Sequence, residues 1–328
     1  VLKTNGGHFA GLPQGARVRR LVSRHAALAV PELVAYLRRE RPPVLLAAKD
    51  RAGRAAIRAR GIAGGPTRVF VRIGNTLSQA LAAKSRLRRA LRYRPIRRLY
   101  PRADGIIAIS QGVAADVIAT AGVAPERVHV APNPVVTDAL ARAGSDPPAH
   151  PWLQQRTEPV MLAAGRLTEQ KDFPTLLRAF ARLLQDRGAR LILLGEGEDR
   201  PALEALAGQL GIHDRLDMPG FVANPHAYVG HADLFALSSA WEGFGNVLVE
   251  ALALGTPVVA TDCRSGPREI LADGRYGPLV PVGDADALAA AMAAVLDDPL
   301  PAATLRAAAQ PYTLERSARR YREILGLG

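Results

Sequence analysis

The sequence predicts an α/β protein made of two domains, each built on a parallel sheet. The chain has 328 residues, and about 150 residues per domain suggests two domains. Short apolar runs alternate with helical patterns in both halves, which is typical of parallel sheets covered by helices on both faces. Segment 143–151, rich in Pro with Gly and Ser, has the composition of a linker and divides the chain into predicted domains 1–150 and 151–328.

The predicted strands and helices alternate along both halves. In the first half we expect strands at 44–47, 69–73, 105–110 and 128–130, and helices near 50–60, 79–99 and 111–121. In the second half we expect strands at 160–164, 191–194, 216–218, 234–237, 258–260 and 279–280, and helices near 174–186, 199–210, 246–254, 284–297 and 313–326. Because open α/β sheets bind ligands at the carboxyl ends of their strands, motifs that follow a strand carry the most weight.

Charge is distributed unevenly between the two halves. Residues 1–150 hold 26 Lys and Arg against 8 Asp and Glu, and residues 151–328 hold 17 against 22. The basic half is expected to meet an anionic partner: phosphate, a membrane surface or nucleic acid. Cys263 is the only cysteine, which excludes an intramolecular disulfide and cysteine-rich metal sites and fits a reducing cytoplasm.

From the sequence we expect neither a signal peptide nor a transmembrane helix. No apolar run reaches the ~18 residues of a transmembrane helix, and residues 1–20 are too polar and basic for a signal peptide. No strand and helix frame Asn5-Gly6-Gly7-His8, so we interpret it as a plain loop rather than a phosphate site.

Two strand ends in the second half combine glycine with charged residues. The predicted strand 160–164 leads into Gly165, Arg166 and Lys171, and two cations at a strand end can bind a diphosphate and neutralise a leaving phosphate. The alternative is a pair of solvated surface charges. The next strand ends in Gly195-Glu196-Gly197, which is either a turn close to a ligand or an ordinary turn before a helix.

Two further strand ends could contact a nucleotide sugar. Phe221 follows a Pro-Gly turn and either lines a base pocket or packs in the core. In the segment 241–250, Gly243 and Gly245 precede a helix whose free amides could bind phosphate or sugar hydroxyls. Glu242 could accept hydrogen bonds from a sugar, whereas Glu250 lies among apolar residues and needs a partner, either a ribose diol or a salt bridge.

In this order, the motifs resemble glycosyltransferase family 4, whose members are retaining enzymes with the GT-B fold. Residues 242–250 look like the family's Glu-x7-Glu signature, and the resemblance covers residues 158–326. Four further segments of this chain are similar to the family's other markers, in the same order: Gly165-Arg166-Leu167 with Lys171, Gly195-Glu196-Gly197, Gly220-Phe221-Val222 and residues 253–259. The resemblance implies two Rossmann-like domains facing across a cleft, with the last helix crossing back to the first domain.

The resemblance also implies roles for single residues. Arg166 and Lys171 would hold the donor diphosphate and stabilise the leaving group, Glu242 would hold the transferred sugar, and Glu250 would bind the ribose. The remaining donor-binding positions are Gly165, Gly195, Glu196 and Gly197, the base-flanking Phe221 and Val222, and Gly243 with the backbone amides of Phe244, Gly245, Asn246, Val247 and Leu248. Asp284-Ala285-Asp286 is predicted to cap a helix rather than bind a metal.

The implied activity is metal-independent transfer of a hexose, with retention of configuration. The donor would be a nucleotide-diphosphate sugar, with a UDP-sugar the expected co-substrate and no cofactor, and the acceptor a saccharide or a lipid-linked glycan in polysaccharide or glycolipid synthesis. The sequence departs from the family at Gly74, where many relatives carry His, and in lacking the usual first strand and helix. A catalytically impaired nucleotide-sugar-binding protein and a sugar-nucleotide epimerase of the same fold therefore stay open as alternatives.

Residues 84–98 form a strongly basic segment. Lys84 and seven arginines alternate with Leu and Tyr in one predicted helix. A basic amphipathic helix is typical of membrane-surface binding, so we expect a cytoplasmic protein with peripheral contact at the inner face of the plasma membrane. The alternative is a solvated cationic face. Nucleic-acid binding is not expected, because no stacking aromatics or recognition motif accompany the charge.

Overall fold

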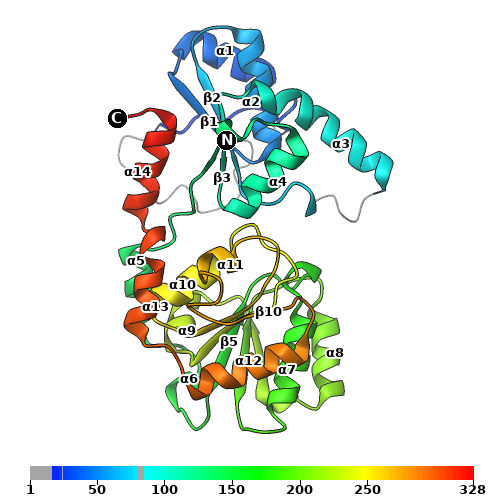
Figure 1. Ribbon diagram of the computed structural model, residues 1–328, viewed down its shortest axis with the longest axis vertical. Helices are drawn as coiled ribbons and strands as arrows, with labels where there is room; N and C mark the ends of the chain where they lie inside the picture. The colour runs from blue at the N-terminus through cyan, green and yellow to red at the C-terminus, as the bar shows by residue number, and fades with distance from the viewer. Residues whose placement is uncertain (1–16, 24, 80–84) are drawn as a thin grey trace. The chain divides into compact units, whose positions relative to one another are not determined.

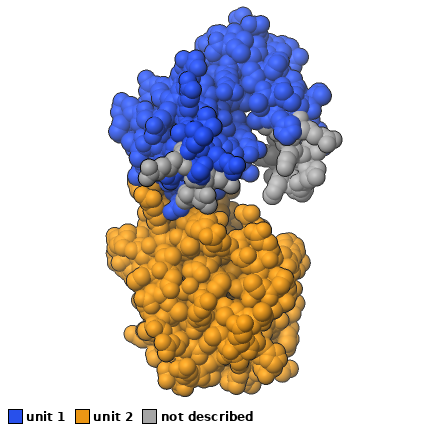
Figure 2. All heavy atoms as spheres, turned by 90° about the vertical axis from the view of Figure 1, so that its right-hand side faces the viewer, with its two compact units in different colours: residues 1–109, 113–130 blue, residues 110–112, 131–328 orange. Residues whose placement is uncertain are grey.

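A computed structural model describes residues 17–23, 25–79 and 85–328. The chain divides into two compact units, one of residues 1–109 and 113–130 and the other of residues 110–112 and 131–328 (Figure 2). The division differs from the boundary predicted at residue 150. The expected linker is packed into the second unit, where His150 is buried with its Nε2 2.7 Å from Asp217 Oδ2.

The first unit contains a four-stranded parallel sheet in the order β1-β2-β3-β4 (Figure 1). Its strands are β1 (Val44–Ala48), β2 (Arg68–Ile73), β3 (Gly105–Ala108) and β4 (Val128–Val130). Its helices are α1 (Val30–Glu40), α2 (Asp50–Ala63), α3 (Arg86–Leu99) and most of α4 (Gln111–Ala121). All four predicted strands are confirmed, whereas α1 was not predicted.

Two predictions for the first half fall on residues outside the described part of the chain. The loop Asn5–His8 and the basic residue Lys84 both lie there. The described residues between 17 and 29 contain no helix or strand.

The turn between β1 and α2 is strained at one residue. Lys49 has φ 74° and ψ 154°, a backbone conformation that is almost confined to glycine. Its N–H donates to the carbonyl oxygen of Arg72 on the neighbouring strand, at 2.9 Å. Such a conformation costs about 1–3 kcal/mol, and strained residues of this kind cluster at functional sites.

The second unit contains a six-stranded parallel sheet in the order β10-β9-β8-β5-β6-β7. Its strands are β5 (Val160–Ala164), β6 (Arg190–Leu194), β7 (Leu216–Gly220), β8 (Leu234–Leu237), β9 (Val258–Thr261) and β10 (Leu279–Val280). The six predicted strands are confirmed. Because the order turns back between β5 and β8, the carboxyl ends of these two strands flank a topological switch point, where such sheets bind ligands.

The helices of the second unit form two groups, and the helices within each group pack against one another. One group contains α7 (Phe173–Leu183), α8 (Arg200–Leu210) and α12 (Ala285–Asp297). The other contains α5 (Asp138–Ser145), α9 (Pro225–His231), α10 (Asn246–Leu254) and α13 (Ala302–Ala309). Short helices α6 (Pro151–Gln154) and α11 (Pro267–Ile270) complete this part of the unit. The apolar core includes Met161, Leu177, Phe180 and Leu191, all fully buried.

The last helix, α14 (Leu314–Leu325), is anchored on the segment that opens the second unit. Ser317 Oγ donates to the carbonyl oxygen of Pro132 at 3.0 Å, and the amides of Val135 and Val136 both donate to that of Tyr312. Thr313 is the N-cap of the helix, and its side chain accepts a hydrogen bond from the amide of Arg316. Its crossing back to the first unit stays a prediction.

Among the described residues, no single helix is long and apolar enough to cross a membrane. The segments Ala285–Asp297 and Ala302–Tyr312 reach the length and apolar composition of a membrane-spanning helix only when they are taken together, and the chain bends by 119° between them.

Candidate functional site

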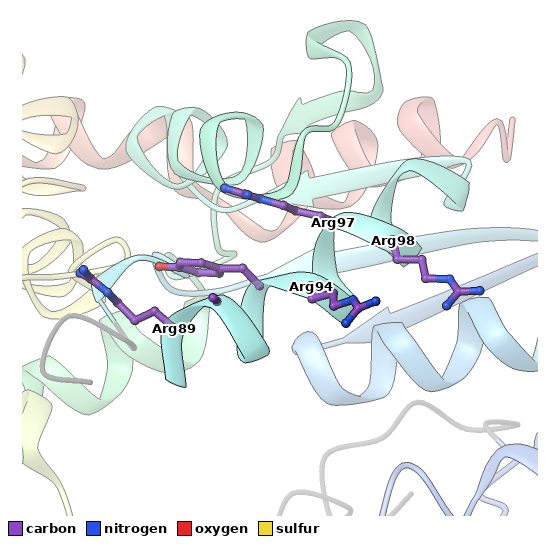
Figure 3. Close-up of a pocket in the computed structure, with 6 residues that line it drawn as sticks. Arg89, Arg94, Arg97 and Arg98 are labelled. Atoms are coloured by element: carbon purple, nitrogen blue, oxygen red, sulfur yellow. The ribbon is translucent and has the colours of Figure 1, made fainter. Parts of the chain in front are cut away.

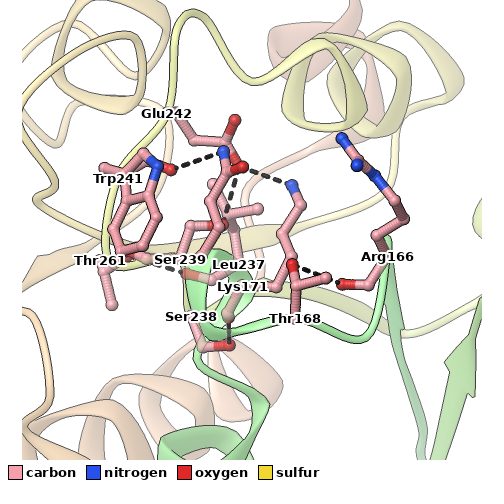
Figure 4. A network of polar contacts seen from close by, with 10 residues as sticks. Arg166, Thr168, Lys171, Leu237, Ser238, Ser239, Trp241, Glu242 and Thr261 are labelled. Atoms are coloured by element: carbon pink, nitrogen blue, oxygen red, sulfur yellow. Dashed lines mark hydrogen bonds and ion pairs between the residues drawn. The ribbon is translucent and has the colours of Figure 1, made fainter. Parts of the chain in front are cut away.

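The loops that follow β5 and β8 are fastened to each other at the switch point (Figure 4). Gln170, in the loop after β5, makes two hydrogen bonds to the loop after β8. Its carbonyl oxygen accepts from the amide of Ala240 at 2.9 Å, and its side chain donates to the carbonyl oxygen of Trp241 at 3.0 Å. Ser238 Oγ donates to the carbonyl oxygen of Lys171 at 2.8 Å. These bonds fix the two loops as one surface, although neither of the two side chains, those of Gln170 and Ser238, was predicted to do so.

A buried ion pair joins the two loops. Lys171 Nζ lies 2.5 Å from Glu242 Oε1, and Ser239 Oγ donates to the same oxygen at 2.8 Å. The Glu242 residue is only 8% exposed, so its carboxylate requires such partners. The sequence predicted separate roles, with Lys171 on the diphosphate and Glu242 on the sugar. The structure instead pairs the two groups with each other.

Arg166 supplies a cation that this pair does not neutralise. Its side chain is exposed and has no partner among the described residues. In Figure 4 its guanidinium points the same way from the β5 loop as the amino group of Lys171. The three charged groups therefore carry a net charge of +1, which favours an anionic ligand over a neutral one.

Glycines let the ends of β5 and β6 approach each other closely. Gly195 has φ 132°, and a Cβ there would lie 1.9 Å from the carbonyl oxygen of Gly165. A Cβ on Gly197 would lie 2.1 Å from the carbonyl oxygen of Leu167, and one on Gly165 would lie 2.8 Å from Lys171 Cε. The predicted glycine positions are thus explained by backbone packing that shapes the site.

The end of β7 presents an aromatic side chain to solvent. Phe221 is 88% exposed, which excludes the core alternative, whereas Val222 is partly buried. The neighbouring Glu196 carboxylate is held by Arg200 Nη1 at 2.9 Å, and Arg200 also donates to the carbonyl oxygen of Met218. An exposed ring beside a fixed strand end is available for stacking on a planar ligand.

The amino end of α10 has free backbone donors. Its N-cap is Gly245, with φ 94° and no side-chain cap. The amides of Asn246 and Val247 have no partner within the described parts of the chain. The amide of Leu248 donates to the carbonyl oxygen of Gly245, and its place near the donor stays a prediction. The two free amides form the anion-binding end of a helix.

The loop before α10 is held by hydroxyl groups and by aromatic packing. The carbonyl oxygen of Gly243 accepts from Ser110 Oγ at 2.8 Å and from Ser265 Oγ at 3.0 Å. The Phe244 side chain is buried, and its ring meets that of Tyr312 edge to face at 5.3 Å. Phe244 therefore fixes the loop by its side chain and can offer only its backbone to a ligand.

Glu250 has a neighbour that sequence reasoning missed. His226, on α9, places Nε2 3.7 Å from Glu250 Oε2, and the carboxylate side chain is 24% exposed. The contact is long, and it is an ion pair only when the histidine is protonated. The only signal in the sequence was an Asn-Pro start of a short helix at 224–225, which places His226 but does not reveal its partner.

Cys263 lies beside the ion pair but is not reactive. It is 3% exposed. Burial raises the pKa of its thiol to about 12, and the negative charge of Glu242 contributes to the rise. Since the thiolate is the reactive form, this cysteine is inert at neutral pH.

The Asp-x-Asp sequence caps a helix as predicted. The Asp284 carboxylate accepts from the amide of Ala287 at 2.8 Å, at the start of α12, and Asp286 pairs with Arg182. Across the residues that the structure describes, no group of three or more His, Cys, Asp or Glu side chains could hold a metal ion.

Two family profiles match the chain. The profile described as Glycosyl transferases group 1 matches residues 150–313, and the one described as Glycosyltransferase Family 4 matches residues 6–139. Together the matches extend over both units.

Curated relatives share about a third of their residues with the chain. The N-acetylgalactosamine-N,N'-diacetylbacillosaminyl-diphospho-undecaprenol 4-alpha-N-acetylgalactosaminyltransferase of Campylobacter jejuni is 32% identical over 61% of this chain and 53% of its own length. The lipopolysaccharide core biosynthesis glycosyltransferase LpsE of Rhizobium meliloti is 39% identical over 49% of this chain and 44% of its own. The chain spans about half the length of these relatives.

Solved structures share the fold. The lipopolysaccharide outer core galactosyltransferase WaaB superposes with a TM-score of 0.71 at 22% identity, over 92% of this chain and 80% of its own. Anabaena Alr3699/HepE, in complex with UDP and glucose, superposes with a TM-score of 0.73 at 23% identity, over 91% and 81%. At these identities the likeness shows the fold, which agrees with the two parallel-sheet units described above.

Proposed function

The chain belongs to the group 1 glycosyl transferases and has the GT-B fold, and on this premise we propose that it transfers a hexose from a nucleotide-diphosphate sugar to a saccharide or lipid-linked acceptor. The observation that carries the proposal is the Lys171–Glu242 pair at the switch point of the second unit's sheet, with Arg166 beside it. The cations proposed to bind the diphosphate and the carboxylate proposed to bind the sugar thus lie on one hydrogen-bonded surface.

The donor diphosphate would bind to Arg166, Lys171 and the two free amides of α10. Phosphate oxygens are strong acceptors and compete with Glu242 for the Lys171 amino group. When the diphosphate takes that amino group, the Glu242 carboxylate is released to accept hydrogen bonds from the sugar hydroxyls. The ion pair of the empty site is therefore exchanged for two separate interactions with the donor.

The transfer step would retain the anomeric configuration. The acceptor hydroxyl attacks the anomeric carbon from the face that the phosphate leaves, so the bond from this carbon to the phosphate oxygen breaks as the new glycosidic bond forms. The acceptor proton passes to the departing phosphate. Arg166 and Lys171 neutralise the charge that grows on the phosphate, which is the task a metal ion performs in other phosphate chemistry.

The nucleoside would bind to the β7 end and to α10. Phe221 would stack on the base, and Glu250, oriented by His226, would accept hydrogen bonds from the ribose diol. UDP is the nucleotide we propose, in keeping with its presence in the Alr3699/HepE complex.

The acceptor we propose is a glycan in polysaccharide or lipopolysaccharide synthesis, built on a lipid carrier or on a saccharide. Relatives support this choice through their names, which refer to a diphospho-undecaprenol glycan in one protein and to the lipopolysaccharide core in another.

Gly74 favours one alternative, a protein that binds the donor without transferring its sugar. No side chain occupies the position where many relatives carry histidine, and Arg72 Nη1 lies 3.6 Å from where a Cβ would be. A single experiment separates sugar transfer from donor binding without transfer.

That experiment is a transfer assay followed by NMR. Wild type is screened for stabilisation by UDP-, GDP- and ADP-sugars, and the best donor is incubated with a glycan acceptor in the presence of EDTA. We expect a product whose anomeric proton coupling matches that of the donor, formed at least ~100-fold more slowly by Glu242→Ala. Donor binding without any transfer would favour the impaired protein, and an inverted product would reject the mechanism.

We also propose that α3 contacts an anionic membrane surface (Figure 3). A pocket on this helix is lined by Arg89, Ala90, Tyr93, Arg94, Arg97 and Arg98. Arg97 is held in place, with Nε bonded to the carbonyl oxygen of Thr120 and its guanidinium 5.8 Å from the Tyr93 ring centre. No carboxylate among the described residues pairs with these arginines.

Two leucines on the same helix support membrane contact over a merely solvated cationic face. Leu87 and Leu91, one helical turn apart, are 71% and 61% exposed. Charge reversal of Arg88, Arg89, Arg94 and Arg98 to Glu should abolish sedimentation with phosphatidylglycerol vesicles. The same reversal at Arg51, Arg58, Arg316 and Arg319, four exposed arginines elsewhere, should reduce it much less. Equal effects of the two sets would leave only non-specific attraction.

A further inference from the structure

The loop that leads from β8 to Glu242 is bonded on both sides to the segments at the ends of the neighbouring strands. On one side, Ser238 Oγ donates to the carbonyl oxygen of Lys171, in the segment after β5, at 2.8 Å. On the other side, Thr261 Oγ1, at the end of β9, donates to the carbonyl oxygen of Ser239 at 2.6 Å (Figure 4). The first half of the loop is therefore fixed in place.

Gln170 fixes the second half of this loop with two hydrogen bonds. Its carbonyl oxygen accepts from the amide of Ala240 at 2.9 Å, and its Nε2 donates to the carbonyl oxygen of Trp241 at 3.0 Å. The second bond acts on the peptide group that joins Trp241 to Glu242. Because a peptide group is planar, a bond that holds its oxygen also sets the direction in which the chain enters Glu242.

None of these loop anchors uses the amino group of Lys171. In the proposed binding of the donor, phosphate oxygens take this amino group, and Glu242 loses the contact that it has with Nζ at 2.5 Å. Ser239 Oγ donates to the same carboxylate oxygen at 2.8 Å, but Ser239 belongs to the same loop and moves with it. Once the donor is bound, the position of the Glu242 carboxylate therefore depends on the anchors of its loop.

The side-chain bond of Gln170 has little to contribute to the stability of the unit. Gln170 and Trp241 are both partly exposed, so water could satisfy the Trp241 carbonyl oxygen if the glutamine were absent. A hydrogen bond at such a place contributes only modestly to folding. Its main consequence is geometric, because it fixes the residue next to Glu242.

We propose that Gln170 is a positioning residue for the transfer reaction. Through the Trp241 carbonyl it keeps the Glu242 carboxylate in place for the transferred sugar after the donor diphosphate has taken Lys171. The inference rests on the proposed function for the donor and its sugar, and Gln170 acts through Glu242 rather than on the sugar. Because a displacement of about 1 Å in a reacting site can cost on the order of 100-fold in rate, the loss of this bond should affect turnover.

The kinetic test is Gln170→Met, which removes the side-chain donor and keeps the length of the side chain. We expect kcat to fall at least ~10-fold, while the affinity for UDP, which carries no sugar, changes less than about twofold. The control Gln154→Met removes a bond of the same kind in the same unit, from Nε2 to the carbonyl oxygen of Pro148 at 2.9 Å, and should change neither quantity. An unchanged kcat in Gln170→Met, or equal losses in the two variants, would overturn the proposal.

A double mutant separates positioning from a general loss of structure. If Gln170 acts through Glu242, Gln170→Met should slow transfer no further once Glu242→Ala has removed the carboxylate. A loss of folded protein would instead lower the rate by the same factor in both backgrounds, and that result would contradict the proposal.

Tryptophan fluorescence tests the anchor without turnover. The chain has two tryptophans, Trp152 and Trp241, so Trp152→Phe leaves Trp241 alone. In this background Gln170→Met should raise the acrylamide quenching constant of Trp241 about twofold, because the loop opens more easily. Glu242→Gln, which weakens only the ion pair, should leave the constant unchanged.

The opposite order of the two quenching effects would overturn the proposal, because the ion pair would then hold the loop. Failure of the wild type to transfer any sugar would reject the proposed function, and the quenching comparison would still decide whether Gln170 holds the loop in place.

Discussion

The amino group of Lys171 lies 2.5 Å from a carboxylate oxygen of Glu242, across the switch point of the sheet in the second unit. The pair is largely buried, with side-chain exposures of 15% and 9%. A buried pair of this kind contributes little net stability, because the attraction only offsets the cost of removing both charges from water. Its placement is therefore better explained by ligand binding than by folding.

Removal of the Glu242 charge should separate donor binding from transfer. In Glu242→Gln the amino group of Lys171 loses its neutralising partner, so UDP should bind a few-fold more tightly, an effect on the order of 1 kcal/mol. Transfer should fall ~100-fold, because the sugar loses a charged acceptor of its hydroxyl hydrogen bonds. Calorimetry and turnover are compared with Glu315→Gln, an exposed acid on α14. Weaker UDP binding in Glu242→Gln would show that the carboxylate does not compete with the diphosphate.

Phe221 should contribute to donor affinity without contributing to stability. Its ring is 88% exposed, so Phe221→Ala should leave the unfolding free energy within about 0.5 kcal/mol of wild type. The loss of a base stack should weaken UDP binding by about 1–3 kcal/mol. Urea unfolding and UDP titration measure the two effects, with Leu300→Ala, another exposed apolar residue, as the control. An unchanged UDP affinity would place the base elsewhere.

Two glycine-to-alanine substitutions should change stability in opposite directions. In Gly195→Ala the new Cβ would lie 1.9 Å from the carbonyl oxygen of Gly165, at φ 132°, so we expect a loss of more than about 3 kcal/mol. In Gly208→Ala the Cβ meets nothing within 4 Å in the last turn of α8, so we expect a gain of about 0.5–1 kcal/mol. Urea denaturation of both variants checks the contrast. Equal effects would mean that the ends of β5 and β6 are not in close contact.

Cys263 should make the protein less stable at alkaline pH. The pKa of its thiol rises from 9.0 to about 12 on folding. Between these values the unfolded chain loses the thiol proton while the folded protein retains it, so the unfolding free energy falls as pH rises, by at most about 1.4 kcal/mol per pH unit. Cys263→Ala should show a shallower fall between pH 9 and pH 11. Parallel curves for the two proteins would mean that the thiol ionises equally in both states.

The strands and the glycine-rich strand ends could be predicted from sequence because their signals are local. Continuous apolar runs predict buried parallel strands, and Gly165, Gly195 and Gly197 mark the points where two backbones meet. The partners of the charged residues could not be predicted in the same way. The Lys171–Glu242 pair joins residues 71 positions apart, and the contact of His226 with Glu250 depends on how α9 packs against α10.

Composition does not show how a proline-rich segment packs. The Pro-rich segment near residue 150 was predicted to be a linker, but His150 is buried there and its ring meets those of Trp152 and Tyr228. Lys49 carries no sequence signal at all, because its strain is a property of the backbone and not of the residue type.

The most direct test of the central claim is a calorimetric titration of the protein with UDP, GDP and ADP. Arg166 is exposed and without a partner among the described residues, so Arg166→Ala should leave the fold intact. Arg178→Ala, on α7, is the matched control. We predict one nucleotide bound per chain, with an affinity at least ~10-fold lower in Arg166→Ala and unchanged in Arg178→Ala. If no nucleoside diphosphate binds, or if Arg166→Ala binds it as tightly as wild type, the assignment of the donor site to this surface is contradicted.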